Sequence, residues 1–265
     1  MGKSILMIHG VGCGGDVWSR MRTDFESHGW RCEAPTLYQH LRTITAPPEG
    51  LSDLCLSDYV RAAADYAKQM AQEEGEPPVI IGHSMGGLIA QNIATSNLVS
   101  AAIFLTPAAP HDCASASLAQ AFTFANIILA PKKTRTTRAY KVWKTGFMWG
   151  VVNCVPASRR QDIYDQARYD SGSVYQDLTD LENAAGEVGV IDETQIQIPT
   201  LTIGAGRDRA TPAAMVRKIA DKYKKSGTPG DYKEYPHNGH WILDEPGVET
   251  VTRDILNWLD VAIKK

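Results

Sequence analysis

The most restrictive feature of this 265-residue sequence is a short junction between an apolar run and a helical pattern. The apolar residues 79–81 lead into Gly82-His83-Ser84-Met85-Gly86, and a helix is predicted over Met85–Ser96. A Gly-x-Ser-x-Gly sequence between a strand and a helix predicts a sharp, strained turn that exposes the serine hydroxyl, and glycines let strand and helix approach closely. Ser84 is therefore the candidate nucleophile; the alternative is an ordinary helix N-cap in a glycine-rich turn.

The remainder of the chain largely alternates short apolar or β-branched runs with longer amphipathic ones. This alternation predicts parallel strands with helices on both faces. The predicted strands are Ser4–Ile8, Trp30–Ala34, Val79–Ile81, Ala101–Leu105, Thr200–Ile203 and Tyr232–Tyr235, and the other predicted helices are Leu56–Gln72, Pro212–Lys224 and Val248–Ile263. We expect an α/β fold with a mostly parallel sheet of about six strands.

Residues 111–198 interrupt this alternation and contain no convincing buried strand. Four helices are predicted there, over Ser117–Leu129, Thr137–Val152, Ser158–Asp170 and Tyr175–Asn183. We expect an inserted helical cap at residues 111–198 on an α/β core of residues 1–110 and 199–265. Aromatic and methionine side chains of the cap either line a substrate pocket or only pack the cap onto the core. The candidate substrate-binding residues are Gly10, Trp143, Phe147 and Met148.

A serine hydroxyl needs a base to take its proton, and that base needs an orienting acid. In strand–helix folds of this kind the acid and then the histidine follow the serine in chain order, at the carboxyl ends of strands. Asp208 lies in the turn after the predicted fifth strand, and His240 follows the last strand. Asp112 and His237 are the weaker alternatives for acid and base.

The oxyanion of a tetrahedral intermediate needs preplaced donors. The backbone N–H of Met85, directly after the nucleophile, is one candidate, and that of Val11, in the loop after the first strand, is the other. His9 and His83 stand beside glycines in tight turns and are interpreted as structural.

The same first loop also satisfies a dinucleotide-binding pattern. Residues 10–15 read Gly-x-Gly-x-x-Gly after a strand, and Glu33 ends the second strand at nearly the expected distance. Tyr140 and Lys144 even have the Tyr-x-x-x-Lys spacing of short-chain dehydrogenases. An NAD-dependent oxidoreductase would leave Ser84 and its partners unexplained, so it is the minor alternative.

The first loop at His9-Gly10, the Ser84 motif and the turns that carry Asp208 and His240 together resemble the α/β-hydrolase superfamily. The resemblance is in particular to its small serine carboxylesterase and lipase-like members. The resemblance implies a Ser84–His240–Asp208 triad, an oxyanion hole at Val11 and Met85, and hydrolysis of carboxylic esters of small to medium hydrophobic molecules without metal or organic cofactor. The usual hairpin before the strand ending in His9-Gly10 is absent, so a reduced sheet is expected. Lactones, thioesters and carbon–carbon bonds are alternative substrates of the same triad, and a hydrolase-fold receptor is an alternative from another class.

Charge, apolar stretches and cysteine content limit the classes of partner that are expected. A net charge of −3 gives no reason to expect nucleic acid or an anionic membrane. The apolar stretch Ala121 to Ala130 is shorter than the ~20 residues of a membrane span. Five scattered cysteines without a Cys-x-x-Cys pair predict neither disulfides nor a structural zinc site. We expect a cytoplasmic protein with a small-molecule ester as its partner and no stable membrane insertion.

Overall fold

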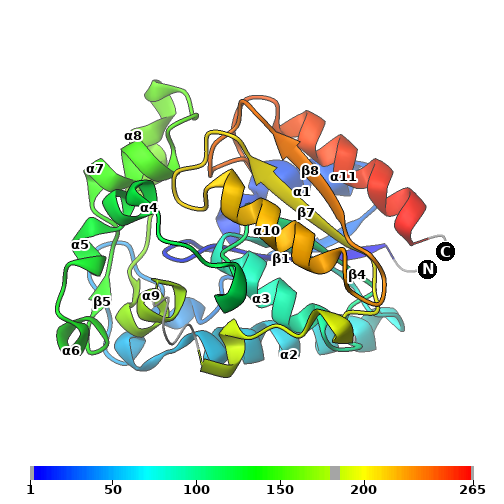
Figure 1. The fold of residues 1–265 in the computed structure, drawn as a ribbon, viewed down its shortest axis with the longest axis horizontal. Coiled ribbons are helices and arrows are strands. Elements are labelled where there is room, and N and C mark those ends of the chain that lie inside the picture. The colour runs from blue at the N-terminus through cyan, green and yellow to red at the C-terminus, as the bar shows by residue number, and fades with distance from the viewer. Residues whose placement is uncertain (1–2, 180–185, 264–265) are drawn as a thin grey trace.

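A six-stranded parallel sheet forms the centre of the computed structural model, which describes residues 3–179 and 186–263 (Figure 1). The strand order is β2-β1-β3-β4-β7-β8, and each adjacent pair is parallel. The strands are β1 (Ser4–Ile8), β2 (Arg31–Glu33), β3 (Val79–His83), β4 (Ala101–Leu105), β7 (Thr200–Ala205) and β8 (Asp231–Tyr235). The predicted α/β fold class with about six strands is therefore confirmed.

Side chains of the central strands alternate between two apolar layers. Ile5 and Met7 of β1 join one layer, whereas Leu6 and Ile8 join the other. Because helices cover both faces, the whole of β1, β3 and β4 is buried, which explains their uninterrupted apolar sequences. The covering helices are α1 (Ser19–Ser27) and α11 (Val248–Ala262) on the first face, and α2 (Leu56–Glu74), α3 (Met85–Ala94) and α10 (Ala213–Tyr223) on the second.

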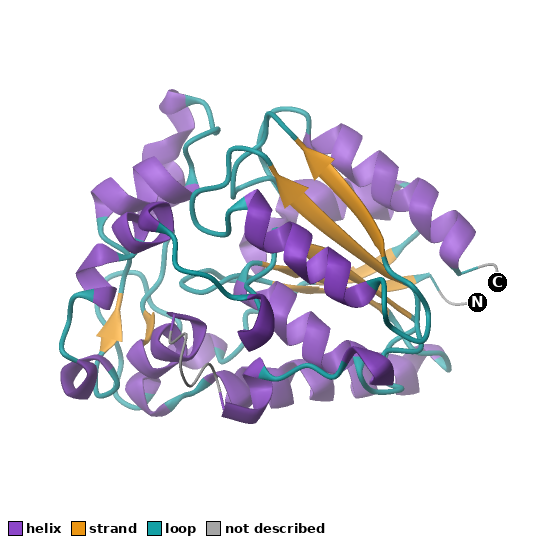
Figure 2. Ribbon diagram, in the orientation of Figure 1, coloured by secondary structure: helices purple, strands orange, loops and turns teal. Residues whose placement is uncertain are grey.

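The chain between β4 and β7 contributes no strand to this sheet, and most of its helices lie beyond the ends to which the strand arrows point (Figure 2). Its last described part returns along α2 and α3 to the start of β7. We call residues 111–198 the cap segment. Its helices are α4 (Leu118–Thr123), α5 (Ala125–Ile128), α6 (Lys132–Arg135), α7 (Lys144–Gly146), the π-helical turn η5 (Phe147–Val151), α8 (Ala157–Asp165) and α9 (Gly172–Thr179), and its two short antiparallel strands are β5 (Ala139–Tyr140) and β6 (Asp170–Ser171). Short 3-10 turns complete the described chain at Gly15–Trp18, Gln39–Leu41, Leu51–Asp53, His111–Cys113, Gly186–Gly189 and Glu193–Gln195.

The cap segment is more broken than its sequence predicts. The helix predicted over Ser117–Leu129 divides at Phe124, and the helix predicted over Thr137–Val152 is replaced by β5, α7 and η5. The helix predicted over Ser158–Asp170 ends at Asp165, because Asp170 and Ser171 pair with β5. The predicted helix Tyr175–Asn183 corresponds to α9, and its residues beyond Thr179 lie outside the described ranges.

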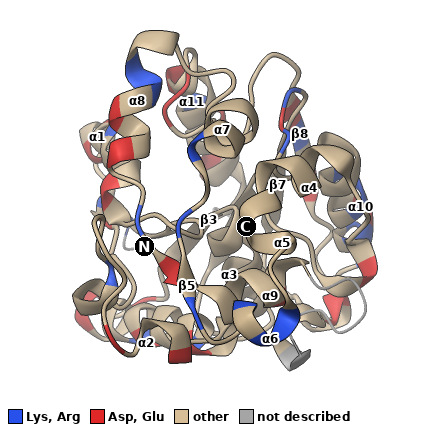
Figure 3. Cartoon of the chain, turned by 90° about the vertical axis from the view of Figure 1, so that its left-hand side faces the viewer, with Lys and Arg blue, Asp and Glu red and all other residues tan. Residues whose placement is uncertain are grey.

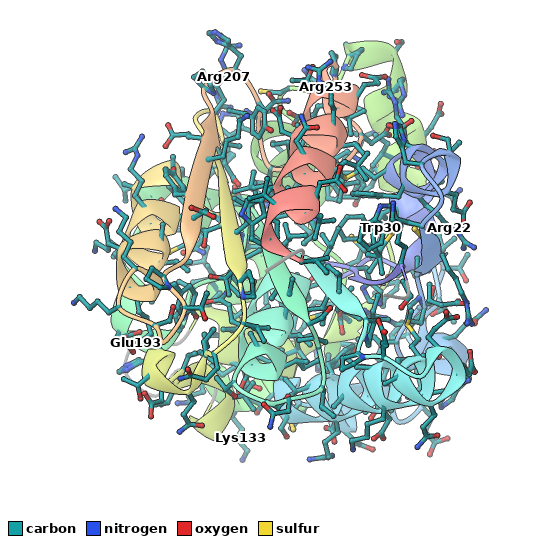
Figure 4. The ribbon with its side chains drawn as sticks, turned by 90° about the vertical axis from the view of Figure 1, so that its right-hand side faces the viewer. Arg22, Trp30, Lys133, Glu193, Arg207 and Arg253 are labelled. Atoms are coloured by element: carbon teal, nitrogen blue, oxygen red, sulfur yellow. The ribbon has the colours of Figure 1, made fainter. Side chains whose placement is uncertain are left out.

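Two further surface features are a basic run and a large hollow. The basic run at residues 132–135 coincides with α6, which Figure 3 colours blue for lysine and arginine. A hollow of about 800 Å³ lies among residues that precede strands, such as Lys3 and Trp30. That edge is opposite to the one at which parallel sheets place their sites. Figure 4 views the molecule from the side on which Trp30 is labelled. Within the described ranges, no helix combines the length and apolarity needed to cross a bilayer.

Candidate active site

Ser84 occupies a strained turn between β3 and α3. Its φ angle is +56°, a conformation that non-glycine residues rarely adopt. The flanking glycines are required by close packing, since a Cβ on Gly82 would lie 1.9 Å from the Gly86 carbonyl oxygen. A Cβ on Gly86 would lie 2.2 Å from the carbonyl oxygen of Ile8 at the end of β1. The motif therefore forms the strand-to-helix elbow that its glycines predict.

Asp208 and His240 form a buried pair at the ends of β7 and β8. His240 Nδ1 lies 2.8 Å from Asp208 Oδ2, and both side chains are almost completely buried. The parallel register of Ala205 with Tyr235 brings their two loops side by side. Because Asp208 accepts the Nδ1 proton, His240 Nε2 is left as the acceptor nitrogen.

The Asp208 carboxylate is held by the start of the next helix. Its Oδ1 accepts the N–H groups of Ala210 and Thr211, both at 2.8 Å, and its Oδ2 accepts the Thr211 hydroxyl at 2.8 Å. Three donors on one buried carboxylate fix its orientation toward His240. Sequence reasoning missed the role of Thr211; the spacing Asp-x-x-Thr before a helix was the available signal.

Two contacts place this pair beside the serine. His83, the neighbour of Ser84, donates from Nε2 to the His240 carbonyl oxygen at 2.8 Å. Thr211 lines the same small cavity as Ser84 and has its hydroxyl 3.2 Å from His240 Nδ1. In the described chain no hydrogen bond joins Ser84 Oγ to His240. Such contacts often tighten only when substrate binds.

The two predicted oxyanion donors lie on opposite segments near Ser84. Met85 is the first residue of α3, so its N–H lacks an acceptor within the helix. Val11 lines the small cavity together with Ser84, and a Cβ on the preceding Gly10 would lie 3.1 Å from Ser84 Cβ. Among the described residues, neither the Val11 nor the Met85 N–H has a hydrogen-bond acceptor. Both donors are therefore free for a ligand.

Two cavities flank the loop that carries Val11. The cavity at Ser84 is narrow, about 30 Å³, and is bordered by Val11, Phe124 and Tyr175. A larger one, about 330 Å³, is bordered by Gly12 and Cys13 of the same loop, by Trp241 next to His240, and by the cap segment. Residues 11–13 thus lie between the narrow cavity at Ser84 and the larger cavity.

The predicted substrate-binding residues are distributed unevenly around these cavities. Gly10 lies against Ser84, and Phe147 borders the larger cavity. Trp143 stacks with Phe122 at a ring distance of 5.3 Å and donates its indole N–H to cap carbonyl oxygens. Met148 packs at the margin of the apolar layer. None of the three cap residues lines the narrow cavity at Ser84.

The alternative acid and base lie elsewhere. Asp112 is exposed and paired with Lys222 at 2.5 Å, and His237 is exposed. His9 and His83 are buried; burial, and then the positive charge of Arg42, lowers the pKa of His9 to about 3. Burial, and then the proximity of His240, also lowers the pKa of His83 well below its usual value. Both therefore remain neutral at physiological pH.

The residues of the dinucleotide-type pattern serve other contacts. A Cβ on Gly15 would lie 1.8 Å from the Ala34 carbonyl oxygen, so this glycine packs against the chain after β2. Tyr140 donates its hydroxyl to the Thr134 carbonyl oxygen within the cap segment, at 3.4 Å. Across the described residues, no group of three or more His, Cys, Asp or Glu has the geometry to hold a metal ion.

The fold and the elbow at Ser84 define a hydrolase-type α/β protein, and comparison with known proteins agrees. The Alpha/beta hydrolase family matches residues 5–253, and the chain belongs to this family. A search of curated protein sequences gives no significant match.

Several solved structures share the fold at low sequence identity. Tomato methylketone synthase I, complexed with 2-tridecanone, has 15% identity and a TM-score of 0.72, with 99% of each chain covered. A pyrethroid hydrolase from Sphingobium faniae JZ-2 has 19% identity and a TM-score of 0.70 over 100% of both chains. A methylesterase from Arabidopsis has 13% identity and a TM-score of 0.67, covering 97% of this chain and 99% of its own. These similarities establish the fold alone.

Proposed function

We propose that this protein is a serine hydrolase that cleaves carboxylic esters through Ser84, His240 and Asp208. The observation that carries the proposal is the 2.8 Å contact between buried Asp208 and His240, formed beside a serine held at φ +56°. A histidine whose Nδ1 proton is bound to a carboxylate presents Nε2 as a base, which a serine nucleophile requires. Membership of the family and the esterase and hydrolase neighbours support the same reaction class.

In the proposed reaction, His240 Nε2 removes the hydroxyl proton as Ser84 Oγ attacks the ester carbonyl carbon. The carbonyl oxygen becomes an oxyanion that accepts the N–H groups of Val11 and Met85. His240 then gives its proton to the departing alcohol, which leaves an acyl group on Ser84. A water molecule, deprotonated by His240, attacks the acyl carbon, and the proton returns to Ser84 as the acid is released. No step requires a metal or organic cofactor.

The two cavities suggest how a substrate of small to medium size would lie. We assign the narrow cavity at Ser84 to the smaller of the two groups on the scissile ester. The larger cavity has apolar Phe147, Ile163 and Trp241 on one part of its wall and charged residues on another. We assign it to the bulkier group of the ester, with the hydrophobic part of that group on the apolar wall. The charged lining residues are Asp16, Arg159, Asp162 and Asp244. Gly10 would contact the reacting centre, and Trp143 and Met148 would shape the cap around it.

Hydrolysis of a panel of p-nitrophenyl esters tests the proposal, with the Ser84→Ala variant as the control for background. The wild-type protein is expected to turn over at least one hydrophobic ester, and Ser84→Ala to lose about 10³-fold or more of that activity. The free energy of unfolding of Ser84→Ala, measured with urea, should remain within about 0.5 kcal/mol of the wild-type value, because the serine hydroxyl makes no hydrogen bond in the described chain. Undiminished turnover by Ser84→Ala would refute the proposal. Lactones and thioesters on the same panel would show whether another acyl substrate is preferred.

A further inference from the structure

The loop that carries Val11 is attached to the cap segment through both backbone groups of Gly12. The Gly12 N–H donates to Asp170 Oδ2 at 2.8 Å, and the Gly12 carbonyl oxygen accepts the Arg168 N–H at 2.8 Å. Gly12 has a φ of +68°, a conformation that glycine adopts without strain but does not fix by itself. The conformation of this loop therefore depends on a contact with residues far away in the sequence.

Asp170 can hold Gly12 because further partners bind both oxygens of its carboxylate. Its Oδ2 lies 2.5 Å from Arg42 Nη1, and its Oδ1 accepts the Tyr59 hydroxyl at 2.7 Å. Both charged side chains are fully buried. Burial alone would raise the pKa of Asp170, but the charge and hydrogen bond of Arg42 hold it below its usual value. The carboxylate thus remains a charged acceptor for the Gly12 N–H.

A buried ion pair is expensive to desolvate and is only weak evidence for stability. The position of this pair is relevant to catalysis, because the Asp170 carboxylate accepts the N–H of Gly12, the residue directly after Val11. An N–H aimed in advance at the developing oxyanion is effective only if it does not have to reorient during the reaction. Fixing the Gly12 peptide limits rotation of its neighbour, whose N–H is free of other acceptors in the described chain.

We propose that Asp170, held by Arg42, is a positioning residue that orients the oxyanion loop and so couples the cap segment to the catalytic centre. This inference rests on the proposed ester hydrolysis at Ser84. It adds to that function a dependence of the rate on a buried ion pair that does not contact the substrate.

The test compares Asp170→Ala/Arg42→Met with Tyr223→Phe. The double variant removes the acceptor of the Gly12 N–H and leaves no unpaired buried charge, which single variants would do. Tyr223→Phe is the matched control, because it removes a buried hydroxyl bonded to Gln91 Oε1 at 2.6 Å, on the helix α10 and away from the loop. Both variants are assayed with the best ester of the wild-type panel, with fluorescence confirming that each is folded.

We expect kcat of the double variant to fall about tenfold or more, up to the 10²–10³-fold effect of losing an oxyanion donor, with KM within about twofold. The affinity for a trifluoromethyl ketone, whose serine adduct places an oxyanion in the hole, should fall by the same factor. Hydrogen exchange at the Gly12 amide should accelerate. Tyr223→Phe should keep kcat and inhibitor affinity and lose only stability.

An unchanged kcat and inhibitor affinity in the folded double variant would overturn the positioning role while leaving ester hydrolysis intact. Equal losses of kcat in Tyr223→Phe would also overturn it, because they would show a general effect of weakened packing. Wild-type turnover that persists in Ser84→Ala would instead overturn the proposed function, and the inference with it.

Discussion

His83 and His240 stack as tilted rings 4.9 Å apart, and the Nε2 proton of His83 is bound by the His240 carbonyl oxygen. This contact joins the residue before Ser84 to the loop that carries the proposed base. The contact therefore connects the serine elbow directly to the histidine loop. His83 can perform this role because burial keeps it neutral, so that it donates one hydrogen bond without adding a charge beside His240.

The orienting acid can be identified by a pair of matched carboxylate variants. Asp208→Asn should lower kcat about 10³–10⁴-fold, since an amide facing His240 Nδ1 favours the wrong tautomer. Asp112→Asn should retain activity, because Asp112 is exposed and paired with Lys222. Steady-state kinetics on one ester measures both. A large loss in Asp112→Asn with an active Asp208→Asn would reverse the assignment.

The glycines of the elbow make a prediction for folding stability. Gly82→Ala should lower the free energy of unfolding by more than about 3 kcal/mol, since its Cβ would lie 1.9 Å from a backbone oxygen that cannot move aside. Gly75→Ala is a suitable control, because Gly75 also has a special conformation, φ +77°, but nothing lies within 4 Å of its added Cβ. Its cost should be about 1 kcal/mol. Urea unfolding distinguishes the two, and equal losses would contradict the close approach.

His9 predicts a specific dependence of stability on pH. Its Nε2 accepts the Leu37 N–H at 3.1 Å and its Nδ1 lies 2.8 Å from the Gly10 carbonyl oxygen, so the neutral ring satisfies both contacts. The folded pKa of about 3 is below the ordinary 6.5, so between these values the unfolded chain binds a proton that the folded protein does not. Stability is therefore fully present above pH 6.5 and falls as the pH falls toward 3.

Titration of His9 should change the free energy of unfolding by about 1.4 kcal/mol per pH unit at most. His9→Gln can keep an acceptor for the Leu37 N–H but cannot titrate, so its stability should decline less steeply. Urea unfolding of both proteins at several values between about pH 7.5 and pH 5 gives the comparison. If the free energy of unfolding fell equally with pH in wild type and variant, His9 would contribute nothing to the loss of stability at low pH.

The assignment of the larger cavity to a hydrophobic group can be tested at Phe147. This side chain is buried, borders the cavity and lies 6.1 Å from the Trp241 ring. Phe147→Ala should raise KM about tenfold for esters with a bulky hydrophobic group, and less for short ones, because apolar contact area is lost. Phe122→Ala is the matched control, since Phe122 is partly exposed and stacks on Trp143 and Trp149. A KM independent of substrate size in Phe147→Ala would exclude this cavity as the binding site.

Local patterns in the sequence predicted the central sheet well. All six strands and the helices α2, α3, α10 and α11 lie within a few residues of their predicted bounds, because completely buried strands and long amphipathic helices carry strong patterns. Helix α1 was not predicted; only Met21 and Phe25 are buried on an otherwise polar sequence. In the cap segment, where elements are short, the prediction of four continuous helices was wrong in detail.

The sequence by itself determined the nucleophile candidate and its chain order with Asp208 and His240, because the glycine turn and the strand ends are local features. Only the tertiary structure brought Asp208 within 2.8 Å of His240, and only it placed Asp170 and Arg42 behind Gly12. Neither Arg42 nor Asp170 stands in a motif. A buried ion pair between distant segments is set by how the cap segment packs on the core, and no periodicity along the chain records that contact.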